Sequence, residues 1–329
     1  MSLFVDIEKR LGTFTLRIQL QTDDSIIGLL GASGSGKSLT LRCIAGIERP
    51  DRGRIVIDGE TVFDSERNIC LPPQKRRVGL LFQNYALFPN MTVLQNLLQG
   101  TLHRKNRAER MRCVNEMLER FSLTEQQNLY PHQLSGGQQQ RTAIARMLLS
   151  QPSLIALDEP FSALDAHLRA QLERDMAQTL REYGKHVLFV SHEPNEIYRL
   201  CDCVAVMQNG SIVELGEKHA LFSRPQTAQT ARLLGMQNIA RANEWGLDGE
   251  HLVAVREDAV TLDAKEGIAC DVLSCTEDFD SVLLELHMQK TGGKLFARVD
   301  KDAWSTLPRE TVFAHIDRAS IITLRGDLI

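Results

Sequence analysis

The sequence predicts an α/β protein in which helices flank a parallel sheet, followed by a small, separate all-β domain. Short apolar runs alternate with helical patterns across the first two thirds of the 329 residues, which is typical of such a sheet. A glycine-rich segment, Gly31-Ala-Ser-Gly-Ser-Gly-Lys-Ser38, fits the phosphate-binding pattern G-x-x-x-x-G-K-[ST] between a strand and a helix. After about residue 240, only short runs of alternating apolar and polar residues recur.

The first elements surround this glycine-rich loop. Residues 4–7, 14–18 and 53–58 alternate at period two and predict strands. Ile26–Leu30 is a continuous apolar run, which indicates a buried strand that leads into the loop. A helical pattern over residues 39–45 follows the loop, so the loop has the strand–loop–helix setting that phosphate binding requires.

The middle of the chain reads as a helical insertion into the sheet. Residues 91–150 are polar and helical in pattern, and the clearest amphipathic stretch is 106–121. Strand patterns return at residues 154–157 and 186–190, with a helix between them. We therefore expect a helical subdomain at about 88–150 within an α/β domain.

The C-terminal part is predicted to be a separate β-rich domain. Arg224-Pro225 and the polar stretch Gln226–Gln237 indicate a linker, which places the domains at 1–235 and 236–329. Strands are expected in the alternating runs 252–255, 281–287 and 295–299, with Gly292-Gly293 as the hairpin turn between the last two.

Composition limits the class of protein. Hydrophobic residues make up 43% and charged residues 24%, and no apolar run approaches the roughly 18 residues of a membrane span. The first residues lack a secretory-signal layout, and seven scattered cysteines indicate a reducing compartment without disulfides or zinc. Residues 241–329 carry 10 Lys+Arg against 17 Asp+Glu, a net charge of −7 that argues against nucleic-acid binding there.

The glycine-rich loop predicts a bound nucleotide. Its backbone N–H groups can curl around a phosphate at the positive end of the following helix. Lys37 can reach the β- and γ-phosphates, and the Ser38 hydroxyl can bind Mg²⁺. The predicted cofactor-binding residues are Gly31, Ala32, Ser33, Gly34, Ser35, Gly36, Lys37, Ser38 and Leu39.

Four further segments add chemistry to this loop. Leu134-Ser-Gly-Gly-Gln138 opens a second helix with an exposed serine, again suited to a γ-phosphate. Asp158-Glu159 ends an apolar strand, where Asp158 can hold Mg²⁺ and Glu159 can polarise the attacking water. Gln83 and His192 end two other strands, and Asp165 follows the carboxylate pair.

Each of these segments has a structural alternative when it is taken alone. Gln83 fits a solvated strand end, and His192 fits a loop or core histidine. Asp158-Glu159 fits a helix N-cap with a first-turn acid. Their order and spacing together favour a catalytic reading.

With these motifs, residues 1–235 resemble the ATP-binding subunit of ABC transporters. The resemblance implies a P-loop ABC nucleotide-binding domain that hydrolyses ATP with Mg²⁺ and forms a homodimer with ATP at the interface. The implied roles are Walker A for Gly31–Ser38, the Q-loop glutamine for Gln83, and the signature motif for Leu134–Gln138, including Ser135, Gly136, Gly137 and Gln138. They continue with the Walker B pair for Asp158 and Glu159, the D-loop aspartate for Asp165, and the switch histidine for His192.

In this family, an aromatic residue ahead of Walker A usually stacks on adenine. The nearest candidate here is Phe14, which equally fits a core position.

The resemblance also extends to importers. It implies a permease-binding surface at Asn84–Asn96, with Leu87 and Phe88-Pro89 exposed, and an indirect solute-binding protein partner. The segments 53–59 and 68–89 look most like molybdate-import ATPases, whereas sulfate, ferric-ion and polyamine importers stay open. The subunit is then expected at the cytoplasmic face of the cell (inner) membrane, as a peripheral protein.

The tail resembles the small TOBE-type barrels that end such subunits, around residues 253–258 and 313–320. In molybdate relatives, that region can bind the oxyanion and hold the transporter inactive. The net charge of −7 argues against a broad anion site, while backbone amides and hydroxyls could still form a local one. The preferred interpretation is a module that stabilises the dimer.

The sequence argues against two other ABC classes. A chromosome-maintenance or repair ATPase carries a long heptad coiled coil before the signature motif, and residues 39–133 contain none. A translation-factor ABC protein carries two nucleotide domains in one chain, and this chain has one.

Overall fold

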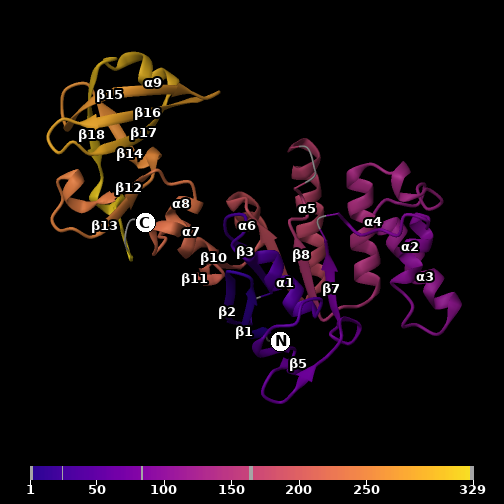
Figure 1. Cartoon of the computed structure of the whole chain (residues 1–329). Helices are drawn as coiled ribbons and strands as arrows, with labels where there is room; N and C mark the ends of the chain where they lie inside the picture. Colours follow the sequence, from indigo (N-terminus) through magenta and orange to yellow (C-terminus); the bar gives the residue numbers. More distant parts are fainter. Residues whose placement is uncertain (1–2, 24, 83, 163–165, 327–329) are drawn as a thin grey trace. The chain divides into compact units, whose positions relative to one another are not determined.

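The computed structural model describes residues 3–23, 25–82, 84–162 and 166–326. Tertiary contacts divide the chain into two compact units, Met1–Lys218 and His219–Ile329 (Figure 1). This division lies N-terminal to the boundary that the sequence predicts after residue 235.

A mixed sheet of eleven strands forms the frame of the N-terminal unit, in the order β6-β5-β4-β1-β2-β11-β10-β3-β9-β8-β7. The strands are β1 (Leu3–Leu11), β2 (Phe14–Thr22), β3 (Ile26–Leu30), β4 (Arg52–Ile57), β5 (Glu60–Asp64), β6 (Ile69–Cys70), β7 (Val78–Leu81), β8 (Leu154–Asp158), β9 (His186–Ser191), β10 (Cys203–Gln208) and β11 (Ser211–Glu217). All six strands predicted in this region are present.

The functional end of this sheet is its parallel part, β10-β3-β9-β8-β7. Leu30 of β3 pairs with Ser191 of β9, and Asp158 of β8 pairs with Val190 of β9. Because the strands are parallel, their carboxyl ends meet at one edge of the sheet. This register brings together the loop after β3, the carboxylates that end β8, and the histidine that follows β9.

Helices cover this sheet and form the predicted insertion. They are α1 (Lys37–Ala45), α2 (Val93–Gln99), α3 (Arg107–Arg120), α4 (Gly136–Leu149), α5 (Ala166–Tyr183) and α6 (Pro194–Leu200). Figure 1 shows α2, α3 and α4 gathered on the side of the unit away from α1. None of the described helices is both long enough and apolar enough to cross a lipid bilayer.

The C-terminal unit contains two small sheets. One has the order β12-β13-β19, with β12 (Asn238–Arg241), β13 (Leu252–Val255) and β19 (Ile322–Leu324). The other has the order β14-β18-β15-β16-β17, with β14 (Val260–Asp263), β15 (Ile268–Glu277), β16 (Ser281–Met288), β17 (Lys294–Asp300) and β18 (Thr311–Ile316). Its outer strands β14 and β17 come into contact, so the sheet is nearly closed like a barrel. The hairpin turn predicted at Gly292-Gly293 is confirmed, and α9 (Lys301–Thr306) follows β17.

The expected linker at Gln226–Gln237 is wrong, because this stretch folds into a helix. After α7 (Lys218–Ser223), the segment forms α8 (Ala228–Leu233), whose N-cap Thr227 accepts a hydrogen bond from the Thr230 N–H at 3.1 Å. Ala228 and Ala231 of α8 pack with Met236 and with buried residues of β13. A polar sequence with two small apolar residues therefore forms a helix because one narrow face is buried.

Candidate nucleotide-binding and hydrolysis site

The loop between β3 and α1 has the backbone geometry of a phosphate cradle. Gly34 and Gly36 have backbone φ values of 81° and 104°, which residues other than glycine rarely adopt. A Cβ on Gly31 would lie 2.5 Å from the Met207 carbonyl oxygen, so the loop also packs tightly against β10. The loop glycines are therefore required by the conformation that exposes Ala32, Ser33 and Gly34 to solvent.

Lys37 folds back across the loop. Its ammonium donates hydrogen bonds to the carbonyls of Gly31, at 2.7 Å, and Ala32, at 3.1 Å. The side chain is 5% exposed, and burial lowers the pKa of Lys37, whereas the nearby charges of Glu159 and Asp158 raise it. A phosphate in the loop would take the place of these carbonyls as the partner of the ammonium.

Ser38 and Asp158 meet although 120 residues separate them. The Ser38 hydroxyl donates a hydrogen bond to Asp158 Oδ1 at 2.8 Å, which joins the first turn of α1 to the end of β8. Burial raises the pKa of the Asp158 carboxyl, and the Ser38 hydrogen bond opposes that shift. A hydroxyl beside a carboxylate offers the hard oxygen ligands that Mg²⁺ takes beside phosphates. Within the described residues, no group of three or more His, Cys, Asp or Glu side chains is placed to hold a metal ion.

Glu159 and His192 form the second pair at this edge. The Glu159 Oε2 atom lies 3.3 Å from Nδ1 of His192, and the two side chains are 22% and 48% exposed. Glu159 has a φ of 47°, a conformation that costs a non-glycine residue about 1–3 kcal/mol. The hydrogen bond from the Glu159 N–H to the Val190 carbonyl, at 3.1 Å, holds this backbone in place. A carboxylate and an imidazole thus lie at the same sheet edge as the loop.

Hydrogen bonds of the neighbouring Ser191 hold the turn that carries His192. The Ser191 hydroxyl donates to Glu196 Oε2 at 2.6 Å and accepts from the Glu193 N–H at 2.9 Å. Glu196 is 5% exposed, and Arg169 of α5 lies 3.8 Å from its other oxygen. The sequence analysis did not identify these residues, because Glu196 has the pattern of an ordinary first-turn acid of α6.

The second glycine-rich motif is at the start of α4. Ser135 is the N-cap of α4 and forms a capping box with Gln138, in which each side chain accepts a hydrogen bond from the other residue's backbone. Ser135 and Gly136 are exposed, whereas Gly137 is buried. In the described part of the chain, no hydrogen bond or ion pair joins Ser135–Gln138 to the Gly31–Ser38 loop. The single chain thus brings together the loop, Asp158, Glu159 and His192, but not the α4 motif.

Two expected site residues, Gln83 and Asp165, lie outside the described residues. Leu39 is partly buried and packs on the core beneath the loop. Phe14 is also partly buried, and its ring tip lies 3.2 Å from where a Cβ on Gly36 would be, so it is next to the loop.

Comparison with known proteins shows the family. Residues 16–162 match the family described as ABC transporter. The chain is 34% identical over 324 residues to the spermidine/putrescine import ATP-binding protein PotA of Roseobacter denitrificans, covering 97% of this chain and 86% of that protein. The chain belongs to the ABC transporter family.

Other ABC relatives differ in the solute that their names give. The molybdate/tungstate import ATP-binding protein WtpC of Archaeoglobus fulgidus is 40% identical over 239 residues, which cover 73% of this chain and 96% of that one. The Fe(3+) ions import ATP-binding protein FbpC of Haemophilus influenzae is 40% identical over 219 residues, 66% of this chain and 62% of FbpC. The match to FbpC thus spans less than two thirds of that relative's length.

Solved ABC cassettes share the fold of the N-terminal unit. A dimeric ATP-binding cassette in a post-hydrolysis state with ADP and Pi superimposes with a TM-score of 0.56 at 27% identity. The match covers 66% of this chain and 99% of that cassette. The predicted fold class, an α/β cassette with a small β-rich C-terminal part, is confirmed.

The surface expected to face a membrane partner lies between β7 and α2. Phe88 is 44% exposed and Pro89 is exposed, whereas Leu87 is half-buried. The Arg146 guanidinium of α4 lies over the Phe88 ring at 5.0 Å and donates to the Ala86 carbonyl at 2.8 Å. An exposed aromatic ring is therefore held on a braced segment.

Proposed function

We propose that this chain is the ATP-hydrolysing subunit of an ABC importer, which energises uptake of an oxyanion through a membrane permease. The observation that carries the ATPase part is the pairing of Ser38 with Asp158 beside Glu159 and His192, at the edge where the glycine-rich loop begins α1. This constellation has the parts that phosphoryl transfer to water needs: a phosphate cradle, metal ligands and a base.

In this proposal, the loop and Lys37 bind and orient the phosphates of ATP. The backbone N–H groups of Gly34–Ser38 surround them, and Lys37 exchanges its carbonyl partners for phosphate oxygens. Ser38 and Asp158 would hold Mg²⁺, which when bound neutralises charge on the phosphates. Asp158 is ionised in that state, because a cation beside a carboxylate favours its charged form.

Glu159 and His192 handle the attacking water. Glu159 accepts a proton from the water as its oxygen approaches the γ-phosphorus. His192 lies 3.3 Å from that carboxylate and keeps it oriented toward the loop. Gln83 completes the set as the Q-loop residue and as a further Mg²⁺ ligand.

A second copy of the chain supplies the α4 motif. Ser135 and the exposed N-terminus of α4 are suited to a γ-phosphate, and the similar solved cassettes are dimers. We therefore propose a homodimer in which Ser135, Gly136, Gly137, Gln138 and Asp165 of each copy complete the partner's site. ATP binding closes the dimer, and hydrolysis lets it open.

The variant Glu159→Gln tests this assignment. The amide keeps the size of the side chain but cannot accept the proton, so we expect ATP binding to persist and turnover to fall by about 100-fold or more. Size-exclusion chromatography with ATP and Mg²⁺ should then show a trapped dimer. The control Glu116→Gln removes one charge from an exposed position on α3 and should leave both properties unchanged. ATP hydrolysis by Glu159→Gln at the wild-type rate would refute the role of Glu159.

Molybdate is the proposed solute, and sulfate, ferric ion and polyamines are the alternatives. The molybdate proposal depends on the likeness of residues 53–59 and 68–89 to molybdate-import ATPases, and the relatives include molybdate/tungstate, ferric-ion and polyamine import proteins. The exposed Phe88 segment within Asn84–Asn96 is the proposed permease contact, at the cytoplasmic face of the cell (inner) membrane. The C-terminal barrel-like sheet fits a TOBE-type module, which we propose stabilises the dimer.

The solute is tested on the complex of this chain with its permease and solute-binding protein. Loading the binding protein with molybdate or tungstate should stimulate ATP hydrolysis, whereas sulfate, ferric ion and spermidine should not. Stimulation by one of the other solutes alone would replace molybdate and leave the ATPase assignment intact. An ATPase indifferent to the permease and to every loaded binding protein would overturn the importer proposal.

A further inference from the structure

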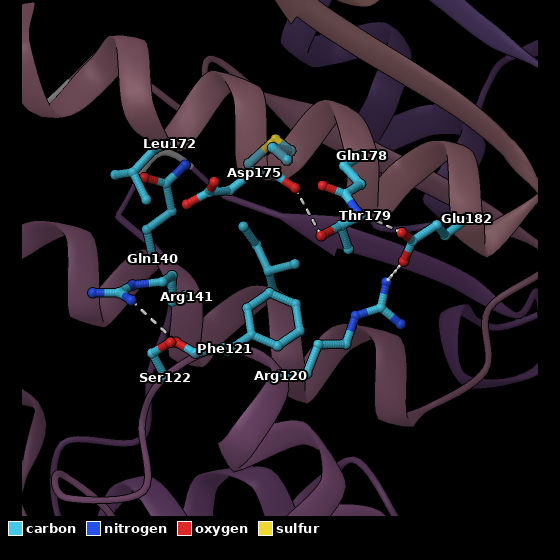
Figure 2. A pocket seen from close by; sticks show the side chains of 12 residues that line it. Arg120, Phe121, Ser122, Gln140, Arg141, Leu172, Asp175, Gln178, Thr179 and Glu182 are labelled. Carbon is cyan, nitrogen blue, oxygen red and sulfur yellow. Dashed lines mark hydrogen bonds and ion pairs between the residues drawn. The ribbon is translucent and has the colours of Figure 1, made fainter.

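A cavity of about 260 Å³ opens between the helical insertion and α5. Its walls come from the end of α3 and the segment after it, from α4, and from α5 between Leu172 and Glu182 (Figure 2). None of its lining residues belongs to the nucleotide site described above. The cavity is therefore a separate feature of the N-terminal unit.

The cavity has an apolar floor and a polar rim. Phe121, Ile144 and Met176 form the floor and are 8%, 5% and 3% exposed. At the rim, Arg120 of α3 forms an ion pair with Glu182 of α5, and Gln178 donates to the same carboxylate at 2.8 Å (Figure 2). A flat ligand could therefore place its apolar face on the floor and its polar edge against the polar side chains of the walls.

One polar side chain of the wall is buried without a partner. Gln140 of α4 is 0% exposed, and neither its amide nitrogen nor its amide oxygen has a hydrogen-bond partner within the described residues. Figure 2 shows this amide extended toward α5, beside Leu172 and Asp175. Buried amides are nearly always hydrogen-bonded, so an unpaired donor and acceptor that line a cavity indicate a ligand with the complementary pair.

We propose that this cavity binds a small planar molecule that carries an amide edge, such as an aromatic carboxamide or a cyclic lactam. Such an edge presents one acceptor and one donor side by side, which is the complement of the Gln140 amide. The ring of the ligand lies on Phe121 and Ile144, where aromatic and aliphatic contacts are available. The volume is slightly below the usual range for drug-sized ligands, so it suits a single ring system.

The position of the cavity suggests why its occupation matters. Gln140 is in the second turn of α4, whose N-cap is Ser135, and the opposite wall of the cavity is α5 of the sheet-covering layer. A bound molecule therefore links the helix that presents the signature serine to α5. The binding itself does not depend on the proposed ATPase function.

Methyl NMR of the full chain, with nicotinamide as the probe, tests the proposal. Titration should shift the Ile144 and Met176 methyl signals saturably, while Ile27 in β3, outside the cavity, stays unchanged. The matched compound N,N-dimethylnicotinamide keeps the ring and carbonyl but lacks the N–H donors, so its affinity should be at least about tenfold lower.

The variant Gln140→Met tests the role of the amide. Methionine matches the length of glutamine without its hydrogen-bonding groups, so nicotinamide affinity should fall at least about tenfold while the floor persists. Gln140→Leu serves as a second variant if the first does not fold. Absence of saturable shifts at Ile144 and Met176, or equal affinity of the variant or the dimethyl compound, would overturn the proposal.

Discussion

The hydroxyl of Ser191 joins the turn that carries His192 to the buried carboxylate of Glu196. It donates to Glu196 at 2.6 Å and accepts from the Glu193 N–H at 2.9 Å, so both neighbours of His192 are held. We infer that Ser191 is a positioning residue for His192. The variant Ser191→Ala should lower the kcat of ATP hydrolysis about 10- to 100-fold with little change in KM, because the reacting groups lose alignment while the loop is intact.

A double-mutant cycle separates this role from general destabilisation. If Ser191 acts only through His192, then Ser191→Ala adds nothing to the loss already caused by His192→Ala. Ser191→Thr, which keeps a hydroxyl, should restore most of the activity. Additive losses of the two alanine variants, measured by steady-state kinetics, would show that Ser191 acts by another route.

Asp158 allows a test of how much folding stability is lost by burying a carboxylate at the proposed metal site. Burial raises the pKa of its carboxyl above the ordinary value of 3.8, so the folded chain binds this proton more tightly than the unfolded chain. The contribution of this group to stability therefore falls as the pH rises from about 3.8 through the raised pKa. Without nucleotide and Mg²⁺, Asp158→Asn should be more stable than the wild type at neutral pH, and the two should converge in acid.

Urea unfolding of the N-terminal unit at several pH values measures this difference. Asp6→Asn, which removes an exposed carboxylate from β1, is the control and should follow the wild-type curve. Asp158→Asn should also fail to hydrolyse ATP, so it exchanges function for stability. A variant less stable than the wild type at neutral pH would show that the Lys37 and Arg42 charges outweigh burial.

For single residues, the sequence predicted the site residues themselves but not the hydrogen bonds that hold them in place. Gly31–Ser38, Asp158-Glu159 and His192 were expected to act together from their order and spacing and from the resemblance to the ABC family. The Ser191–Glu196 hydrogen bond was not foreseen, since a serine and a helical first-turn acid are common anywhere. Only the fold shows that Glu196 is buried beneath Ser191.

Among the elements, α2 braces the segment that carries the exposed Phe88. Asn96 of α2 is fully buried, and its side chain accepts from the Phe88 N–H at 3.0 Å. The same side chain donates to the carbonyls of Phe88, Met91 and Thr92 at 3.0–3.2 Å. One side-chain amide therefore forms hydrogen bonds with several backbone groups of the turn that leads into α2.

Replacing this amide should release the segment without touching the nucleotide site. Asn96→Ala leaves the Phe88 N–H and the Met91 carbonyl without this partner, whereas the carbonyls of Phe88 and Thr92 keep their hydrogen bonds from the Met91 and residue-96 backbone N–H groups. Each group that loses its partner costs about 1–3 kcal/mol when water cannot reach it. We expect faster hydrogen exchange at residues 84–92 and loss of permease stimulation, with basal ATP hydrolysis retained. Asn106→Ala removes the N-cap of α3 instead and should leave residues 84–92 protected. Unchanged exchange there in Asn96→Ala would contradict the bracing role.

The elements themselves follow closely from the sequence where one period dominates. The strands at 26–30 and 154–158 and the helix at 107–120 match their predicted runs to within a few residues. The helix α8 was missed because its buried face consists mainly of alanines, which produce little amphipathic signal. Its burial is decided by contacts with β13, which are distant in sequence.

Among the described residues, each of the two units has hydrophobic core clusters of its own, including one under α8 in the C-terminal unit. A large cluster packs against the eleven-stranded sheet, and another lies within the barrel-like sheet of the C-terminal unit. The charge division follows the same pattern, with a net charge of −7 over residues 241–329 and +3 over residues 1–240. Two units with their own cores are each expected to fold independently.

The place of the division can be tested with two fragments. A fragment of residues 219–329 keeps α8 against β13, and it keeps the hydrogen bond from the Arg256 guanidinium to the Phe222 carbonyl, at 2.7 Å. A fragment of residues 236–329, cut at the sequence-predicted boundary, loses both and uncovers Leu252 and Leu324, which pack with α8. Exposing one such leucine costs about 1.5–3 kcal/mol, and each kcal/mol lowers the Tm of a domain of this size by about 4–8 °C.

Thermal unfolding followed by circular dichroism should therefore give a markedly lower Tm for the shorter fragment. The variant Ala231→Asp in the longer fragment is the matched control, because it places a charge at a fully buried position of α8 without shortening the chain. It should lower the Tm in the same direction as the cut, since both remove the packing of α8 on β13. Equal stability of the two fragments would show that α8 contributes nothing to the C-terminal core, and it would move the division to residue 235.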